Sequence, residues 1–334
     1  MDIRLFIYPT GGKGPASSNP YIKNLKASMA QHFVLIEPKY RVKLPRMLVF
    51  LLNSFKADVY VLNWIEDSAA ERGGLIGALM SLLGLFIVKI RKAKIIWIFH
   101  NIHSHAGETK WSLRFRNFLF KHSSLIIAHS QEAKDYAKRQ SNCPVYFRPH
   151  PMKVIDYGCY QSEVDDCDFF YWSTILPYKG VVEFLSEPQC TSSGKKIILI
   201  GKCKDEDLSN KIKARVSQNI RYENRNADFC EVAAYCRKSK YVIFPYVGDS
   251  ISSSGVLMDT LLLGGTPVGP NKGAFADLAG VGCCITYNNI KEIFDLPTQE
   301  DDCIKLDKRN VDAFIKDNSW DAFGTWFKKT IAEL

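Results

Sequence analysis

The regular alternation of strand-like and helix-like segments limits this chain to few folds. In its first half, short runs rich in β-branched residues alternate with amphipathic helical patterns, and the connections between them are short. We expect strands at 3–8, 33–37, 58–62, 94–99, 125–128 and 145–147, with helices at 21–31, 44–55, 75–91, 113–121 and 132–139. Such β/α alternation predicts an open parallel sheet whose ligands bind beyond the carboxyl ends of the strands.

The second half repeats this pattern, so the chain is predicted to form two α/β domains. Strands are expected at 169–173, 195–201, 220–222 and 241–244, with a helix at 229–237. A chain of 334 residues is too long for one ordinary domain, and its 46% apolar and 24% charged residues are typical of globular proteins. We therefore divide it into an N-terminal domain, 1–155, and a C-terminal domain, 156–334, whose last helix is free to pack back on the first.

A glycine-rich loop follows the first expected strand. It contains Gly11 and Gly12, and it leads through Asn19 to Tyr21 at the start of a helix. The spacing fits neither the dinucleotide fingerprint nor the P-loop. Two interpretations remain, a flexible loop over a substrate cleft and a plain surface loop.

Three histidines follow the expected strand at 94–99. They are His100, His103 and His105, with Asn101 between the first two. Their spacings in a loop without nearby carboxylates are poor metal-ligand geometry, so we expect no metal. A hydrogen-bonding role beside a cleft and a structural role both remain open.

The stretch from Phe244 to Asp277 predicts a helix N-terminus at the carboxyl end of a strand. Its first residues, Ser253, Ser254, Gly255 and Val256, would offer free backbone N–H groups to a phosphate. Asp259 lies about one turn further, where a carboxylate can accept hydrogen bonds from a ribose. The alternative is an ordinary serine cap on the helix.

Lys179 is the candidate cation of the second half. It follows the strand at 169–173 and precedes a helix, which puts it at the mouth of the predicted sheet. The alternative is a solvated lysine at a helix start.

Charge divides the chain into two different halves. Residues 1–155 hold 23 Lys and Arg against 9 Asp and Glu, a net of +14, whereas the remainder holds 21 against 26, a net of −5. Basic residues gather at 39–46 and 89–92, which predicts docking on an anionic membrane; a solvated charged face is the alternative. Nucleic acid is a third possible partner of a basic half, but no DNA- or RNA-binding module is found.

Other features indicate a cytosolic protein. The apolar run 75–88 is too short to cross a bilayer and predicts a buried or interfacial helix. The chain opens directly on a strand rather than on a secretion signal. Its ten cysteines contain no CxxC pair, so buried reduced thiols are expected.

The order of several short motifs resembles that of GT-B glycosyltransferases, in particular the family-4-like bacterial enzymes of capsular and exopolysaccharide assembly. The resemblance spans nearly the whole chain and rests on Asn19-Pro20-Tyr21, Trp97, His100-Asn101, His105, His129-Ser130, His150-Pro151, Pro177-Tyr178-Lys179-Gly180, Phe244-Pro245-Tyr246, Ser254-Gly255 and Gly265-Thr266-Pro267-Val268.

This resemblance implies two Rossmann-like domains that face a central cleft, with no metal or other cofactor. It matches Lys179 to the lysine that binds the donor diphosphate, Asp259 to the acid that holds the ribose, and His100 to the histidine near the donor sugar. With these we group Gly11, Gly12 and the helix start 253–256 as donor-binding residues. Asn19, Tyr21, Asn101 and His105 are the acceptor-binding candidates.

Two positions depart from the family pattern. Ile251 stands where the first acid of the family's pair is expected, although Asp249 is nearby, and no arginine precedes Lys179 in the usual place. We expect a retaining transferase that moves a sugar from a nucleotide-sugar to a lipid-linked or oligosaccharide acceptor at the cytosolic membrane face. The alternatives are an epimerase-like GT-B enzyme, a catalytically inactive scaffold and a nucleic-acid-binding protein.

Overall fold

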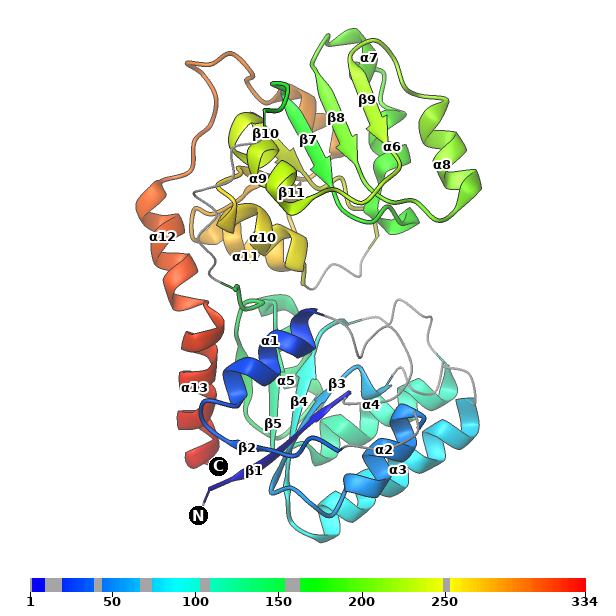
Figure 1. The fold of residues 1–334 in the computed structure, drawn as a ribbon, viewed down its shortest axis with the longest axis vertical. Coiled ribbons are helices and arrows are strands. Elements are labelled where there is room, and N and C mark those ends of the chain that lie inside the picture. Colours follow the sequence, from blue (N-terminus) through cyan, green and yellow to red (C-terminus); the bar gives the residue numbers. More distant parts are fainter. Residues whose placement is uncertain are drawn as a thin grey trace. The chain divides into compact units, whose positions relative to one another are not determined.

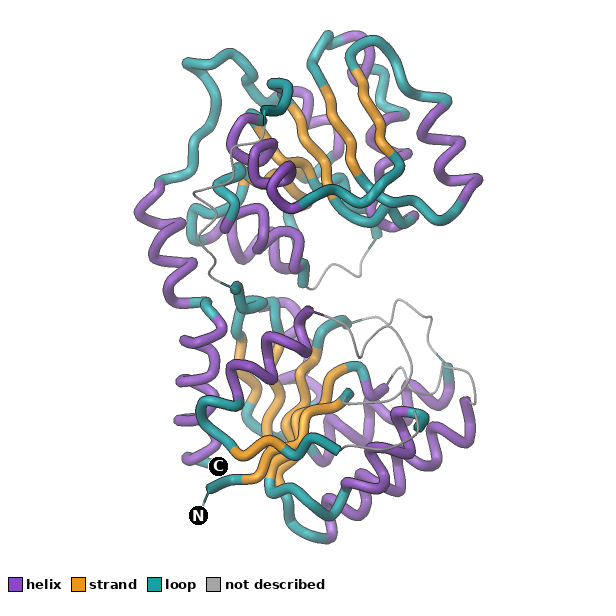
Figure 2. The backbone as a smooth tube through the Cα atoms, in the orientation of Figure 1, coloured by secondary structure: helices purple, strands orange, loops and turns teal. Residues whose placement is uncertain are grey.

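The chain forms two α/β domains, each built on a parallel sheet of six strands (Figure 1). The computed structural model describes residues 2–9, 20–38, 44–66, 74–102, 109–153, 163–248 and 253–334. The N-terminal domain is Met1–Lys153 together with Asn318–Leu334, and the C-terminal domain is Val154–Asp317. In each domain, helices cover both faces of the strand layer (Figure 2). The expected two-domain Rossmann-like fold is confirmed.

The N-terminal sheet has the strand order β2-β1-β3-β4-β5-β6. Its strands β3 and β4 are buried along nearly their whole length, which explains why they read as almost continuous apolar runs. The chain reverses its direction of winding between β1 and β3, where ligands of such sheets bind. The strands are β1 Arg4–Tyr8, β2 Val34–Leu35, β3 Val59–Asn63, β4 Lys94–Phe99, β5 Leu125–Ala128 and β6 Val145–Phe147.

One predicted strand is shorter than expected. We predicted 33–37, but β2 comprises only Val34–Leu35. β2 is an edge strand and pairs only with Arg4 and Leu5 of β1. The residues on either side of β2 have no second strand with which to form a longer ladder.

Two helical layers sandwich the N-terminal sheet. The helices α2 Arg46–Asn53, α3 Gly74–Ile90, α4 Lys110–His122 and α5 Gln131–Gln140 pack on one face. The other face is covered by α1 Pro20–Met29 and by α13 Trp320–Ala332, the last helix of the chain. The Ser28 hydroxyl donates a 2.6 Å hydrogen bond to the Trp320 carbonyl and fixes α1 to α13.

The C-terminal sheet has the strand order β12-β11-β10-β7-β8-β9, so its switch point lies between β7 and β10. Its strands are β7 Phe169–Trp172, β8 Ile197–Ile200, β9 Ile220–Glu223, β10 Tyr241–Ile243, β11 Pro267–Pro270 and β12 Ile285–Tyr287. Its helices are η3 Pro177–Lys179, α6 Val181–Leu185, α7 Gln189–Ser192, α8 Glu206–Lys213, α9 Phe229–Lys238, α10 Gly255–Leu262, α11 Gly273–Gly280, η4 Ile290–Asp295 and α12 Lys308–Asp317.

Among the described residues, none of the helices combines the length and the apolar character that crossing a bilayer requires.

Candidate functional site

A cluster of aromatic and polar side chains lies at the carboxyl ends of the N-terminal strands. Tyr21 of α1 is at its centre, with ring centroids 4.9 Å from His100, 5.6 Å from His129 and 5.0 Å from His150. His100 follows β4 and His129 follows β5, so parallel strands bring together residues far apart in the chain. Trp320 from α13 closes the cluster, 5.0 Å from the Tyr21 ring.

Asn63 fixes the tautomer of His100. The Asn63 side-chain N–H donates to the Tyr8 carbonyl at 2.8 Å, so its amide oxygen is the atom 3.0 Å from His100 Nε2. That oxygen only accepts, so Nε2 carries the proton and Nδ1 is left as an acceptor. Burial, and then the neighbouring His129 and His150, hold the pKa of His100 well below its usual value, so the ring is neutral at pH 7.

Trp64 supports the other side of His100. The two rings stack at 4.1 Å with an interplanar angle of 19°. Trp64 has φ of 51°, in the left-handed region that aromatic residues rarely adopt, and such backbone strain often occurs at functional sites. Sequence reasoning missed both Asn63 and Trp64. Their position directly after a buried strand was the signal available.

His129 and His150 are also neutral. The Arg148 carbonyl accepts from His129 Nδ1 at 2.7 Å, so Nε2 accepts the 2.9 Å hydrogen bond from the Tyr21 hydroxyl. His150 Nδ1 donates to the Pro151 carbonyl at 3.0 Å. Burial lowers the pKa of His129 to about 3 and that of His150 to about 4. The cluster is therefore a polar, uncharged surface suited to hydrogen bonds with hydroxyl groups.

Lys179 lies beyond the carboxyl end of β7, at the switch point of the C-terminal sheet. It is only 7% exposed, and its ammonium donates to the Ser173 hydroxyl at 2.8 Å and lies 5.5 Å from the centre of the Tyr246 ring. No carboxylate of the described residues forms an ion pair with it. Burial lowers the pKa of Lys179 to about 8. Burying a cation without an ion pair is unfavourable, and an anionic ligand is one way to offset that cost.

Gly180 sets the backbone next to Lys179. Its φ is +65°, and a Cβ at this position would lie 1.8 Å from the Pro245 carbonyl oxygen. The loop after β7 and the loop after β10 therefore approach so closely that only glycine fits. This approach brings Lys179 beside Tyr246.

The start of α10 joins the same group of residues. Ser254 caps the helix by accepting from the Leu257 N–H. Tyr246 also forms a hydrogen bond with Ser254; burial raises the pKa of Tyr246, and this hydrogen bond partly offsets the rise. Lys179 and the predicted helix start are thus connected through Tyr246. Ser253, Gly255 and Val256 are partly buried beside this cap.

Asp259 lies one turn into α10. It is partly buried, and burial raises its pKa to about 6. No hydrogen bond to its carboxylate is found among the described residues. It is thus a carboxylate with unused acceptor capacity on the helix whose start adjoins Lys179.

The remaining predicted residues have less structural support. Asn101 is described and partly buried at the end of β4. Gly11, Gly12, Asn19 and His105 lie outside the described residues, as do Asp249 and Ile251. Within the described part of the chain, no group of three or more His, Cys, Asp or Glu is placed to hold a metal ion.

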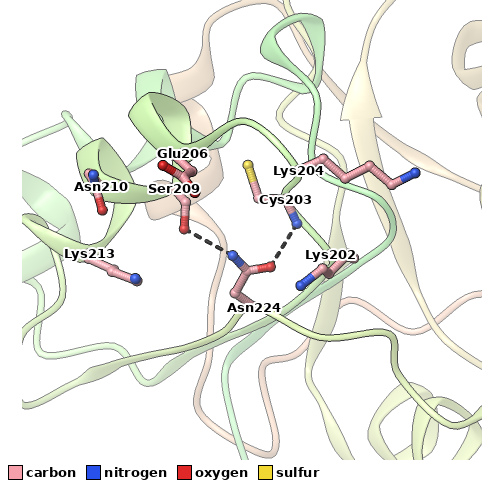
Figure 3. A pocket seen from close by; sticks show the side chains of 8 residues that line it. All are labelled: Lys202, Cys203, Lys204, Glu206, Ser209, Asn210, Lys213 and Asn224. Atoms are coloured by element: carbon pink, nitrogen blue, oxygen red, sulfur yellow. Dashed lines mark hydrogen bonds between the residues drawn. The ribbon is translucent and has the colours of Figure 1, made fainter.

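A polar cavity of about 470 Å³ opens near the carboxyl ends of β8 and β9 (Figure 3). Lys202, Lys204 and Lys213 line it, and Asn224 lies at its centre with hydrogen bonds to Ser209 and the Cys203 N–H. None of the residues predicted from sequence lines this cavity.

Comparisons with known proteins identify structures of similar fold. No protein-family model matches the chain, and no curated protein matches it by sequence. Among solved structures, the Anabaena protein Alr3699/HepE in complex with UDP is similar with a TM-score of 0.68 at 14% identity, over 99% of this chain and 100% of that one. Its complex with UDP-glucose gives a TM-score of 0.67 at 15% identity, over 99% of each chain.

A second enzyme has the same architecture. The α,α-trehalose-phosphate synthase (UDP-forming) of Burkholderia vietnamiensis gives a TM-score of 0.65 at 10% identity, over 100% of this chain and 98% of that one. At such identities the likeness shows the fold, and it confirms the GT-B architecture expected from the sequence.

Proposed function

We propose that this protein is a glycosyltransferase that moves a sugar from a nucleotide-sugar to a lipid-linked glycan precursor. The observation that carries this proposal is the buried Lys179 ammonium at the switch point of the C-terminal sheet, which forms no ion pair with any residue that the structure describes. The likeness to structures solved with UDP and UDP-glucose supports a uridine diphosphate sugar as the first donor to test.

Lys179 would bind the donor diphosphate. When the glycosidic bond breaks, negative charge grows on the leaving diphosphate, and a cation already held in a water-poor site stabilises that charge without reorganising. The free N–H groups of Gly255 and Val256 at the start of α10 would add hydrogen bonds and the positive end of the helix dipole. No metal is needed in this scheme, and we propose none.

Asp259 would hold the ribose. Its carboxylate accepts no hydrogen bond from the described part of the chain, and a pKa of about 6 leaves it mostly ionised at pH 7. Two ribose hydroxyl groups supply the donors that such a carboxylate accepts. Ribose binding should therefore lower this pKa.

His100 would contact the transferred sugar. Its Nδ1 is an acceptor because Nε2 carries the proton donated to Asn63, so Nδ1 favours a hydroxyl donor. We propose Tyr21 and Asn101, together with Asn19 and His105, as acceptor-binding residues, and Gly11 and Gly12 as donor-binding residues. We expect retention of the anomeric configuration, which the anomeric proton coupling of the product would report.

The acceptor would be met at the inner face of the membrane. The net charge of +14 in residues 1–155 favours an anionic bilayer surface and the diphosphate of a lipid-linked acceptor alike. We propose a peripheral association, in surface polysaccharide assembly such as that of a capsule.

A thermal-shift panel tests the donor site. A ligand at 100 times its dissociation constant adds about 2.7 kcal/mol to the free energy of unfolding. UDP, GDP, ADP and dTDP should therefore separate clearly, with UDP giving the largest rise in Tm. If all four leave the Tm unchanged, the proposed donor site is wrong. Consumption of the nucleotide-sugar without any acceptor would instead favour an epimerase-like enzyme.

A further inference from the structure

Helix α3 has an unusual distribution of side chains. Its inward positions carry mostly small residues, and Gly77, Ser81 and Gly84 allow close packing on the layer beneath. A Cβ on Gly84 would lie 2.7 Å from the Phe50 ring of α2, which shows how tightly the two helices pack. The large apolar residues of α3 therefore point mainly the other way.

The outward face of α3 is a continuous apolar ridge. The ridge consists of six residues whose exposed fractions lie between 51 and 66%: Leu75, Ile76, Leu79, Leu83, Phe86 and Ile90. From Ile76 to Ile90 they recur every three or four residues, so they share one side of the helix, and Leu75 adjoins them at its start. No charged residue occurs in α3 before Lys89. A helix on the surface of a soluble protein normally has polar residues in these positions.

The size of the ridge indicates an interaction surface. Half of six large side chains amounts to several hundred Å², while the largest apolar patch on a typical monomer is about 300–600 Å². Phe55, which follows α2, is also 53% exposed. In contrast, Met47 and Phe50 of α2 are buried. The exposed apolar surface of this layer therefore comes mainly from α3.

The charged residues of the three helices around the ridge are all basic. The helices α2, α3 and α4 form one layer on the N-terminal sheet and contain six Lys and Arg but no Asp or Glu. Lys89, Lys110, Arg114 and Lys121 of this layer are exposed. Figure 1 shows α2, α3 and α4 side by side on this domain. Apolar residues flanked by cations match the chemistry of an anionic bilayer, whose headgroups attract cations while its acyl region accepts apolar side chains.

We propose that α3 is a membrane-inserting element, whose apolar ridge enters the outer acyl region of an anionic bilayer while the cations of α3 and α4 contact the headgroups. This inference rests on the proposed membrane-linked acceptor, and it names the part of the protein that reaches the lipid. At 17 residues α3 is about 25 Å long, and it lies flat on its domain, so it would dip into the interface rather than cross it.

Vesicle sedimentation of the full chain tests this inference. The probes are phosphatidylcholine vesicles with and without 30% phosphatidylglycerol, at about 50 mM and about 1 M salt. The wild type should bind the anionic vesicles at low salt and keep part of that binding at high salt, where the Debye length is about 3 Å and purely electrostatic docking is lost. The variant L79S/L83S/F86S should bind at least about tenfold more weakly, because three large apolar side chains no longer leave water.

A matched control separates this surface from general apolar exposure. V216S/V281S/I304S removes three side chains of the C-terminal domain that are 43–49% exposed, and it should bind vesicles as the wild type does. Both variants should keep the wild-type Tm and UDP response, because the changed residues face outward. A failure of UDP binding in the wild type would refute the donor site and leave the vesicle result standing on its own.

Two outcomes would overturn the inference. One is equal vesicle binding by L79S/L83S/F86S and the wild type. The other is a wild type that forms dimers in solution and binds no vesicles, with L79S/L83S/F86S monomeric; the ridge would then be a contact between two copies of this chain.

Discussion

Replacing Lys179 by methionine should stabilise the free protein and weaken nucleotide binding. Methionine keeps most of the side-chain volume but removes the buried charge. The pKa of Lys179 falls from 10.5 to about 8, and at 1.36 kcal/mol for each pKa unit this corresponds to about 3 kcal/mol of unfavourable charge burial. Part of that gain is lost with the hydrogen bond to Ser173, worth about 1 kcal/mol. We expect K179M to be about 2 kcal/mol more stable at pH 7.

The pH dependence gives an independent check. Between pH 8 and 10.5 the unfolded chain still protonates Lys179 while the native protein does not, so the unfolded state binds more protons. The free energy of unfolding of the wild type therefore rises with pH across this window, and the advantage of K179M disappears. Urea titrations at pH 7 and pH 10 measure both values. UDP affinity of the wild type should fall above pH 8, because the neutral amine no longer attracts the diphosphate.

Lys195→Met is the matched control. The Lys195 ammonium donates to the Phe294 and Leu296 carbonyls at 2.7 and 2.6 Å, so its removal should destabilise the same domain and leave UDP affinity unchanged. In K179M, calorimetry should show at least about tenfold weaker UDP binding, since charge-assisted contacts to a phosphate are worth about 1.5–3 kcal/mol. UDP affinity within twofold of the wild type, or a K179M protein less stable at pH 7, would refute this reasoning.

Three further predictions follow from the site geometry. Asp259→Asn should weaken UDP binding and raise the stability of the free protein at pH 7. Burial raises the carboxyl pKa to about 6, so the stability contributed by the protonated form is lost as pH rises through that value. Unchanged UDP affinity in calorimetry would remove Asp259 from the site. Gly180→Ala should lower the free energy of unfolding by more than about 3 kcal/mol in urea melts, since its Cβ would meet the Pro245 carbonyl at 1.8 Å. Gly194→Ala, with a similar φ of +67° and open space around it, should lower that free energy by only about 1 kcal/mol. Equal losses in the two variants would contradict the contact. ¹⁵N NMR should show His129 protonated at Nδ1 and neutral down to pH 5, and an Nε2-protonated ring would disprove the assigned tautomer. The stability of the wild type should also fall below pH 6.5 more steeply than that of H129Q. The reason is that the unfolded chain gains a proton in this range, whereas the native ring, with a pKa of about 3, stays neutral.

The fold was predictable because its signals are local. Each β-branched run predicts a strand and each amphipathic pattern predicts a helix from nearby residues alone. The alternation of strands and helices then predicts a parallel sheet. The position of Lys179 was predictable for the same reason, since a residue just after a strand of a parallel sheet lies at the ligand edge. What the sequence did not reveal is that Lys179 is buried beside Ser173 and Tyr246. That depends on the close approach at Gly180, which joins segments about 65 residues apart.

The hydrogen-bond directions in the N-terminal cluster were beyond sequence reasoning. Whether His100 offers a donor or an acceptor depends on Asn63, whose amide is in turn oriented by the Tyr8 carbonyl. These three residues come from the ends of different strands, and no spacing in the sequence links them. The apolar pattern of α3 was visible, but a pattern shows only that one side of a helix differs from the other. The structure shows which side packs inward: Gly84, whose missing side chain admits the Phe50 ring of α2, is on that side.

The two candidate groups of residues differ in charge. The histidines of the N-terminal cluster are buried and neutral, so at pH 7 they offer hydrogen bonds without net charge. A sugar is neutral and rich in hydroxyl groups, and under the proposed function His100 Nδ1 would accept from it without the cost of burying a charge. The candidate residues of the C-terminal domain are instead charged: Lys179 is a buried cation, and Asp259 is a partly buried carboxylate. Under the proposed function, a diphosphate would neutralise the first, and a ribose diol would hydrogen-bond to the second. Both desolvation costs of this domain would then be recovered by different parts of one nucleoside diphosphate, so a nucleoside monophosphate should bind more weakly than UDP.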